Sequence, residues 1–279
     1  MPPPAADLAP PIGVFDSGVG GLTVLKSLIA TLPGEHFIYL GDTARLPYGT
    51  KSRETVARYS VQAAEALADY GVKCLVVACN TASAVGLPGI RRHVENVPVI
   101  GVVEPGAEAA CATSRSGHIA VIATEGTVRG GAYQEAIIGK RNDARVTARP
   151  AALFVALAEE GLCEGPIAEG VARHYLDPIF GVKSQGTPDT LVLGCTHFPM
   201  LTTTIRKVVG PGVRIVDSAE TTAHAVRAAL AAGKEPHGGA GPPSRVRFLA
   251  TDSVERFVRI GSRFLDRPIA ADEVELIDL

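Results

Sequence analysis

The feature that most constrains the fold of this chain is a regular alternation of short apolar runs with longer amphipathic stretches. Apolar runs at 12–15, 37–40, 76–79 and 97–103 are separated by segments whose apolar residues recur with helical spacing. Strands that alternate with helices form parallel sheets, because each helix returns the chain to the edge where the next strand starts. The first hundred residues therefore predict a parallel sheet covered by helices on both faces.

The same pattern starts again after Glu104-Pro105-Gly106. The run at 119–124 is followed by small polar residues and a helical stretch through about Ile138, as the run at 12–15 is followed by a glycine turn and a helix. Further on, an apolar run ends in Cys195 as an earlier one ends in Cys79. The predicted fold is α/β, with two pseudo-symmetric doubly wound domains, mainly parallel sheets, and an active site in the crevice between them.

The repeat suggests where the domains divide. We predict a first α/β domain of 11–103 plus 209–279 and a second of 104–208, because the tail has too few apolar residues to fold alone. The Pro/Ala-rich residues 1–10 are expected to be disordered, and the Gly/Pro-rich stretch 233–243 is expected to form a flexible surface loop.

Charge and composition argue against several classes of protein. With 27 basic and 29 acidic residues the net charge is -2, which gives no sign of a nucleic-acid-binding surface. The chain starts without a signal peptide and contains no apolar run near the ~20 residues that span a bilayer, so we predict a cytoplasmic protein without a membrane partner. Its five cysteines are an odd number without a C-x-x-C pair, and we expect reduced thiols.

The turn Gly18-Val19-Gly20-Gly21 follows the first apolar run and has two interpretations. A dinucleotide loop is disfavoured, because G-x-G-x-x-G would require glycine where the chain has Thr23. Backbone amides from Ser17 to Gly21, at the start of a helix, can instead hold a small carboxylate. The alternative is a tight turn that merely needs glycine.

Cys79 and Cys195 each end an apolar run and are followed by small polar residues. Zinc binding through Cys195 and His197 would need further ligands that are not apparent, so no metal is predicted. A cysteine hydrolase with Cys79 as nucleophile would leave the second thiol without a role. Two thiols at matching strand ends instead suit removal of a proton from one face of a carbon and its return to the other.

Four stretches closely resemble the bacterial glutamate racemases of the aspartate/glutamate racemase superfamily. They are 13–24, 41–49, 78–84 and 193–197. This resemblance implies reversible interconversion of L- and D-glutamate without pyridoxal phosphate or another cofactor, which supplies D-glutamate for peptidoglycan. A homodimer is also expected. Racemisation of aspartate or another amino acid, and ligand binding without catalysis, remain as alternatives.

The resemblance also implies roles for individual residues. Cys79 and Cys195 would be the catalytic acid/base pair, Asp16 would assist Cys79, and His197 would assist Cys195. Substrate-binding positions would be Asp16, Ser17, Tyr48, Gly49, Asn80, Thr81, Thr124, Thr127, Thr196 and His197.

An accessory acid is expected on the His197 side. Glu159 matches the first glutamate of the family's Glu-Glu-Gly stretch. Just upstream, this chain has Ala151-Ala152 where many relatives have Cys-Pro, and Ala156 where many have Pro. The choice between Glu159 and Glu160 therefore stays open.

Overall fold

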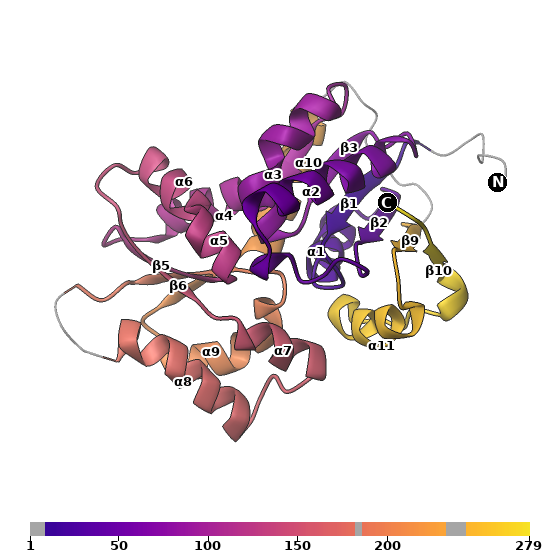
Figure 1. Ribbon diagram of the computed structural model, residues 1–279. Helices are drawn as coiled ribbons and strands as arrows, with labels where there is room; N and C mark the ends of the chain where they lie inside the picture. The colour runs from indigo at the N-terminus through magenta and orange to yellow at the C-terminus, as the bar shows by residue number, and fades with distance from the viewer. Residues whose placement is uncertain (1–8, 182–185, 233–243) are drawn as a thin grey trace.

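The structure, a computed structural model, describes residues 9–181, 186–232 and 244–279 (Figure 1). Its strands are β1 (Ile12–Asp16), β2 (Phe37–Gly41), β3 (Cys74–Val77), β4 (Val99–Gly101), β5 (His118–Ala123), β6 (Arg145–Pro150), β7 (Thr190–Gly194), β8 (Arg214–Asp217), β9 (Val246–Ala250) and β10 (Val274–Leu276). The predictions made for 1–8 and 233–243 lie outside the described residues.

The helices alternate with these strands. They are α1 (Leu22–Thr31), α2 (Arg53–Ala68), α3 (Asn80–His93), α4 (Val103–Thr113), α5 (Glu125–Gly130), α6 (Ala132–Lys140), α7 (Leu153–Glu160), α8 (Pro166–Phe180), α9 (Thr202–Val209), α10 (Ser218–Ala232) and α11 (Val254–Leu265), with 3-10 turns at Tyr48–Thr50, Phe198–Leu201 and Ala271–Glu273. Local signals explain several starts. For example, the Ser52 hydroxyl accepts a hydrogen bond from the Thr55 N–H at 3.2 Å and caps α2.

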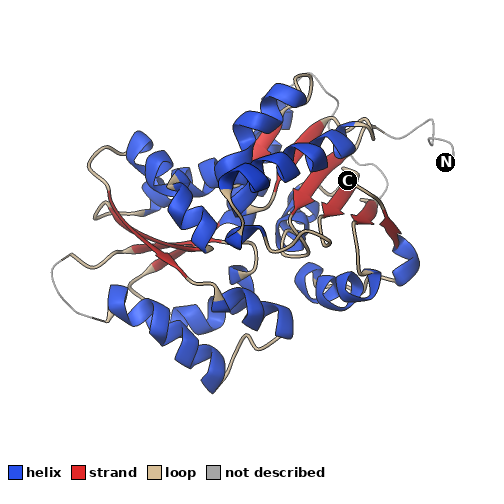
Figure 2. Ribbon diagram, viewed as in Figure 1, coloured by secondary structure: helices blue, strands red, loops and turns tan. Residues whose placement is uncertain are grey.

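Two sheets organise the molecule, and the order of their strands repeats. A six-stranded sheet has the order β10-β9-β2-β1-β3-β4, and a four-stranded sheet has the order β6-β5-β7-β8. Every pair of neighbouring strands in the described residues is parallel. The series β2-β1-β3-β4 thus has its counterpart in β6-β5-β7-β8, and Figure 2 shows helices packed around both sheets. The predicted pair of doubly wound, mainly parallel α/β units is confirmed.

The structure differs from the sequence-based expectation at the boundary near residue 209. β8 pairs with β7 in the second sheet, whereas a first domain beginning again at 209 would contain it. β9 and β10 do extend the first sheet beyond β2, so the rest of the described tail lies with the first unit. The division into two domains stays a proposal, and if it follows the sheets the second boundary falls after Asp217.

Two helices also depart from expectation. α4 runs through Glu104-Pro105-Gly106, because Pro105 lies in the first turn, where its missing N–H costs no helical hydrogen bond. The single helix expected up to Ile138 is broken into α5 and α6 at Gly131, whose φ of 70° is left-handed. β6, β10 and α11 were not predicted from the sequence.

A continuous apolar core joins the two sheets. One cluster of buried residues includes Ile12 of β1 and Leu22 of α1 from the first unit, and Leu193 of β7 and Phe198 from the second. α10 packs against both α1 and α4, and so lies between the two halves of the molecule. Because burial of each such Leu, Ile or Phe side chain contributes about 1.5–3 kcal/mol, this shared core holds the two sheets together with their carboxyl edges on a common crevice.

Candidate active site

A cavity of about 360 Å³ lies where the strands of the two sheets end. It is lined by Ser17, Leu46, Pro47, Tyr48, Gly49, Thr50, Cys79, Asn80, Thr81, Thr124, Glu125, Ala152, Val155, Ala156, Glu159, Cys195, Thr196, His197 and Arg256. Ser17 follows β1, Cys79 follows β3, Thr124 follows β5 and Cys195 follows β7. In each sheet these are the two neighbouring strands between which the chain order reverses, which is where open α/β sheets bind ligands.

Cys79 enters the cavity from the first sheet as the N-cap of α3. Its thiol donates a hydrogen bond to the Ser17 hydroxyl at 3.4 Å, and its sulfur accepts one from the Ala82 N–H at 3.5 Å. Burial, together with the nearby charge of Asp16, raises the pKa of Cys79 to about 12. At neutral pH this side chain is therefore a neutral thiol, able to donate a proton.

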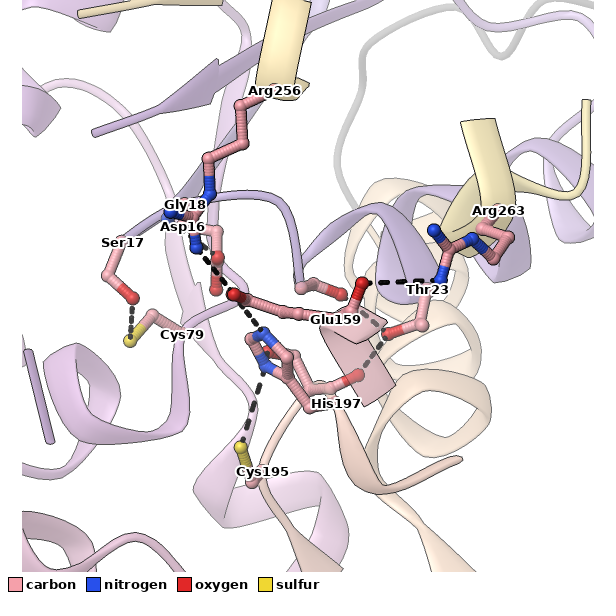
Figure 3. A network of polar contacts seen from close by, with 12 residues as sticks. Asp16, Ser17, Gly18, Thr23, Cys79, Glu159, Cys195, His197, Arg256 and Arg263 are labelled. Atoms are coloured by element: carbon pink, nitrogen blue, oxygen red, sulfur yellow. Dashed lines mark hydrogen bonds and ion pairs between the residues drawn. The ribbon is translucent and has the colours of Figure 1, made fainter. Parts of the chain in front are cut away.

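Cys195 enters from the second sheet in a different electrostatic environment. Its sulfur lies 3.8 Å from His197 Nδ1, and His197 Nε2 lies 3.2 Å from Glu159 Oε1 (Figure 3). Burial alone would lower the pKa of His197, but the interactions with Cys195, Glu159 and Asp16 raise it to about 10. The ring is thus an imidazolium at neutral pH, and a cation beside Cys195 stabilises negative charge on its sulfur.

Glu159, and not Glu160, completes this chain of contacts. Burial raises the pKa of the Glu159 carboxyl, yet the hydrogen bond and charge of His197 and the guanidinium of Arg256 lower it more. Glu159 is therefore ionised opposite the imidazolium. Glu160 does not line the cavity.

Asp16 lies beneath the cavity rather than in its lining. Its Oδ2 accepts a hydrogen bond from the Gly18 N–H at 2.9 Å, while Oδ1 is buried without a partner among the described residues. Burial raises the pKa of Asp16, and the charge of His197 opposes that rise. Because Asp16 contributes to the pKa of both Cys79 and His197, it acts on the two sides of the site through its charge.

Hydroxyl and amide groups line the rest of the cavity. The hydroxyls of Thr81, Thr124 and Thr127 lie within 2.9–3.2 Å of one another, although Thr127 itself is not part of the lining. Asn80 accepts a hydrogen bond from the Tyr133 hydroxyl at 2.8 Å, and its Nδ2 is buried without a partner among the described residues. These groups can bind the carboxylates of a small, polar ligand.

The structure brings together all the residues that the resemblance singled out, with Asp16 and Thr127 just behind the lining. It also adds two residues that the sequence did not suggest, Tyr133 and Arg256. Tyr133 lies on α6 and has no motif around it. Arg256 lies on α11, and only the strongly amphipathic pattern of 254–265 could have indicated that this segment packs against the rest of the chain.

The described parts of the chain hold no cluster of three or more His, Cys, Asp or Glu side chains able to bind a metal ion. Among those same residues, no helix is both long and apolar enough to cross a membrane.

Two parallel sheets that each deliver a thiol to one small cavity define an α/β enzyme acting on a small molecule. Residues 12–226 match the family described as Asp/Glu/hydantoin racemase. The chain is 49% identical to the glutamate racemase of Geobacter metallireducens over 256 residues, covering 91% of this chain and 92% of that one. It is 46% identical to the glutamate racemase of Koribacter versatilis, covering 97% and 98%.

A solved structure gives the same result. The glutamate racemase of Francisella tularensis in complex with D-glutamate is 35% identical and matches with a TM-score of 0.87, covering 96% of this chain and 97% of that one. The chain belongs to the glutamate racemase family, and it is an isomerase.

Proposed function

We propose that this protein interconverts L- and D-glutamate without a cofactor, with Cys79 and Cys195 as the two bases. The observation that carries the proposal is the unequal environment of two thiols in one cavity. Cys79 is a neutral thiol with a raised pKa, and Cys195 lies 3.8 Å from a protonated imidazole. One sulfur is therefore suited to accept a proton while the other is ready to donate one.

The reaction has two proton transfers. In one direction, the Cys195 thiolate removes the proton from Cα, and the Cys79 thiol gives its own proton to the opposite face of the carbanion. Cys195 then carries the proton and Cys79 the negative charge, which is the starting state for the reverse direction. Asp16 and His197 assist the two thiols through their charges. Asp16 raises the pKa of Cys79, and His197 carries a positive charge beside Cys195.

Stabilising the carbanion is the harder part, since the Cα–H bond is a very weak acid. Donors aimed at the substrate carboxylate must carry the developing charge in a site from which water is excluded. The unpartnered Asn80 Nδ2 and the hydroxyls of Thr81, Thr124 and Thr196 are among the donors that line the cavity.

The proposal is tested with each glutamate enantiomer in deuterated water. A two-base mechanism puts solvent deuterium on Cα of the product enantiomer while the remaining substrate keeps its hydrogen early in the reaction. Absence of both racemisation and deuterium incorporation would refute the proposed activity.

The two-thiol mechanism needs separate variants. Cys79→Ser and Cys195→Ser should each lower kcat by roughly 10²–10⁴-fold, because each removes one proton-transfer group. Cys111→Ser is the matched control, since Cys111 lies outside the cavity and donates to the Ile137 carbonyl, which serine can also do. If either active-site variant retained wild-type racemisation, the two-thiol mechanism would be wrong.

Aspartate and other amino acids are the alternative substrates, and assays run side by side distinguish them. We also propose that the D-glutamate formed supplies peptidoglycan and that the enzyme works as a cytoplasmic homodimer, as the resemblance to the bacterial glutamate racemases implies. Depletion of the protein should then make growth depend on added D-glutamate, and light scattering of the purified protein should give twice the chain mass.

A further inference from the structure

The C-terminal helix α11 contacts the catalytic residues of the second sheet. α11 lies between β9 and β10, which belong to the first sheet, whereas Glu159 lies in the last turn of α7, which follows β6 of the second. Arg256 Nη2 donates to Glu159 Oε2 at 2.6 Å, and Arg263 Nη1 donates to the Glu159 carbonyl at 3.2 Å (Figure 3). Two arginines of one helix thus hold a single residue across the crevice.

We infer that Arg256 is a positioning residue, which fixes the Glu159 carboxylate and through it the His197 imidazolium beside Cys195. This inference rests on the proposed function of Cys195 as a base. Arg256 does not need to touch the reacting carbon for this role.

The geometry of the carboxylate supports the inference. Oε1 of Glu159 faces His197 at 3.2 Å, and Oε2 faces Arg256 at 2.6 Å, so each oxygen has its own cationic partner. A carboxylate held at both oxygens cannot rotate away from the imidazole, whereas one held at a single oxygen can. The Glu159 side chain is 17% exposed, so its contacts are only partly screened by water.

The charges of Arg256, Glu159 and His197 also support the inference. Arg256 is the only Lys or Arg among the described residues that line the cavity. Its guanidinium helps to keep Glu159 ionised against the effect of burial, and the ionised carboxylate helps to keep His197 protonated. Loss of the guanidinium should therefore weaken the imidazolium that stabilises negative charge on Cys195.

The kinetic test uses Arg256→Met, which keeps an unbranched apolar stem and removes the charge and the donors of the guanidinium. We expect kcat/KM to fall about tenfold, a modest loss for a charged hydrogen bond because the Arg256 side chain is 44% exposed. The two enantiomers are equally stable, so kcat/KM must fall equally in both directions. The primary isotope effects with α-deuterated L- and D-glutamate are expected to diverge, because only the proton transfer at Cys195 becomes slower. That transfer is the removal of the labelled proton in one direction and the final reprotonation in the other, so one isotope effect rises and the other falls.

Matched variants separate positioning from folding. Arg256→Lys should recover most of the activity, because the ammonium restores the charge. Arg259→Met changes an exposed arginine of the same helix that has no side-chain hydrogen bond or ion pair with the described residues, and it should stay within about twofold of wild type. A merely structural role of Arg256 would lower the rates without separating the two isotope effects.

A readout independent of turnover completes the test. His197 faces Cys195, Glu159 and Asp16, and in Arg256→Met its imidazole should titrate at lower pH by NMR than in the wild type. An unchanged His197 titration together with wild-type kcat/KM and wild-type isotope effects would overturn the inference. A wild-type protein that does not racemise glutamate would instead refute the proposed function, while the NMR titration would still decide the role of Arg256.

Discussion

The glycine turn after β1 allows a close contact between the two halves of the site, and Gly20→Ala should disrupt it. A Cβ at position 20 would lie 2.3 Å from Thr196 Oγ1 and 2.5 Å from His197 Cε1 and Nδ1. Gly20 does not have a positive φ, so alanine can adopt its backbone conformation. The substitution is therefore a purely steric probe of the distance between the first-sheet turn and the loop after β7 that carries Thr196 and His197.

The size of the effect follows from these distances. Restoring an ordinary separation of 3.4 Å from Thr196 Oγ1 needs a movement of about 1 Å. The His197 ring cannot move easily, because its Nε2 contacts Glu159 and the Phe264 ring packs against it with the two ring centroids 5.2 Å apart. A misplacement of about 1 Å in an active site can cost about 10²-fold in rate, or about 2.7 kcal/mol of transition-state stabilisation.

The assay is the rate of optical interconversion of each glutamate enantiomer, followed by circular dichroism. Gly18→Ala is the matched control, because a Cβ there meets only Leu46 Cδ2 at 3.5 Å and the φ is again not positive. We expect kcat/KM to fall about 10²-fold in Gly20→Ala and to change by less than about fivefold, or about 1 kcal/mol, in Gly18→Ala. If Gly20→Ala matched the control, the turn would not constrain the loop after β7 and the steric reasoning would be wrong.

Two further predictions concern buried polar groups around the cavity. Tyr133→Phe removes the donor to Asn80 Oδ1 and leaves a buried acceptor unpaired. The free energy of unfolding, measured in urea, should therefore fall by about 1–3 kcal/mol, and KM should rise. An unchanged unfolding midpoint would contradict this prediction. The pKa of His197 is raised from 6.5 to about 10, so the stability that it adds is complete below pH 6.5 and is lost as the pH rises to about 10. The difference in unfolding free energy between wild type and His197→Gln should shrink over that range, and a constant difference would show that this charge is not linked to folding.

Local patterns in the sequence were sufficient for much of the fold. The spacing of apolar residues in a segment shows whether a strand or a helix would bury them on one side. This spacing depends only on residues that are near one another in the sequence. For the same reason the sequence alone could identify Cys79 and Cys195 as counterparts, because each cysteine ends an apolar run and is followed by small polar residues. β6 has only partly buried or exposed residues, so its sequence carries too weak an apolar pattern to be predicted.

Partners that are distant in sequence were decided by packing alone. Nothing local assigns β8 to the second sheet, since its apolar residues would suit either one, and pairing with β7 makes the choice. Glu159 and Glu160 are adjacent glutamates, and the sequence does not distinguish them. Successive helical residues point about 100° apart, so the orientation of α7 decides that Glu159 reaches His197.

The sequence by itself determined that this chain forms parallel α/β units and that two thiols end matching strands, because both properties reside in short segments. Only the tertiary structure decided that the thiols differ in their environments, with Cys79 buried as a neutral thiol and Cys195 beside an imidazolium. The physical reason is that burial and charge at each sulfur depend on groups far along the chain. Arg256, 61 positions after Cys195, contributes through Glu159 and His197.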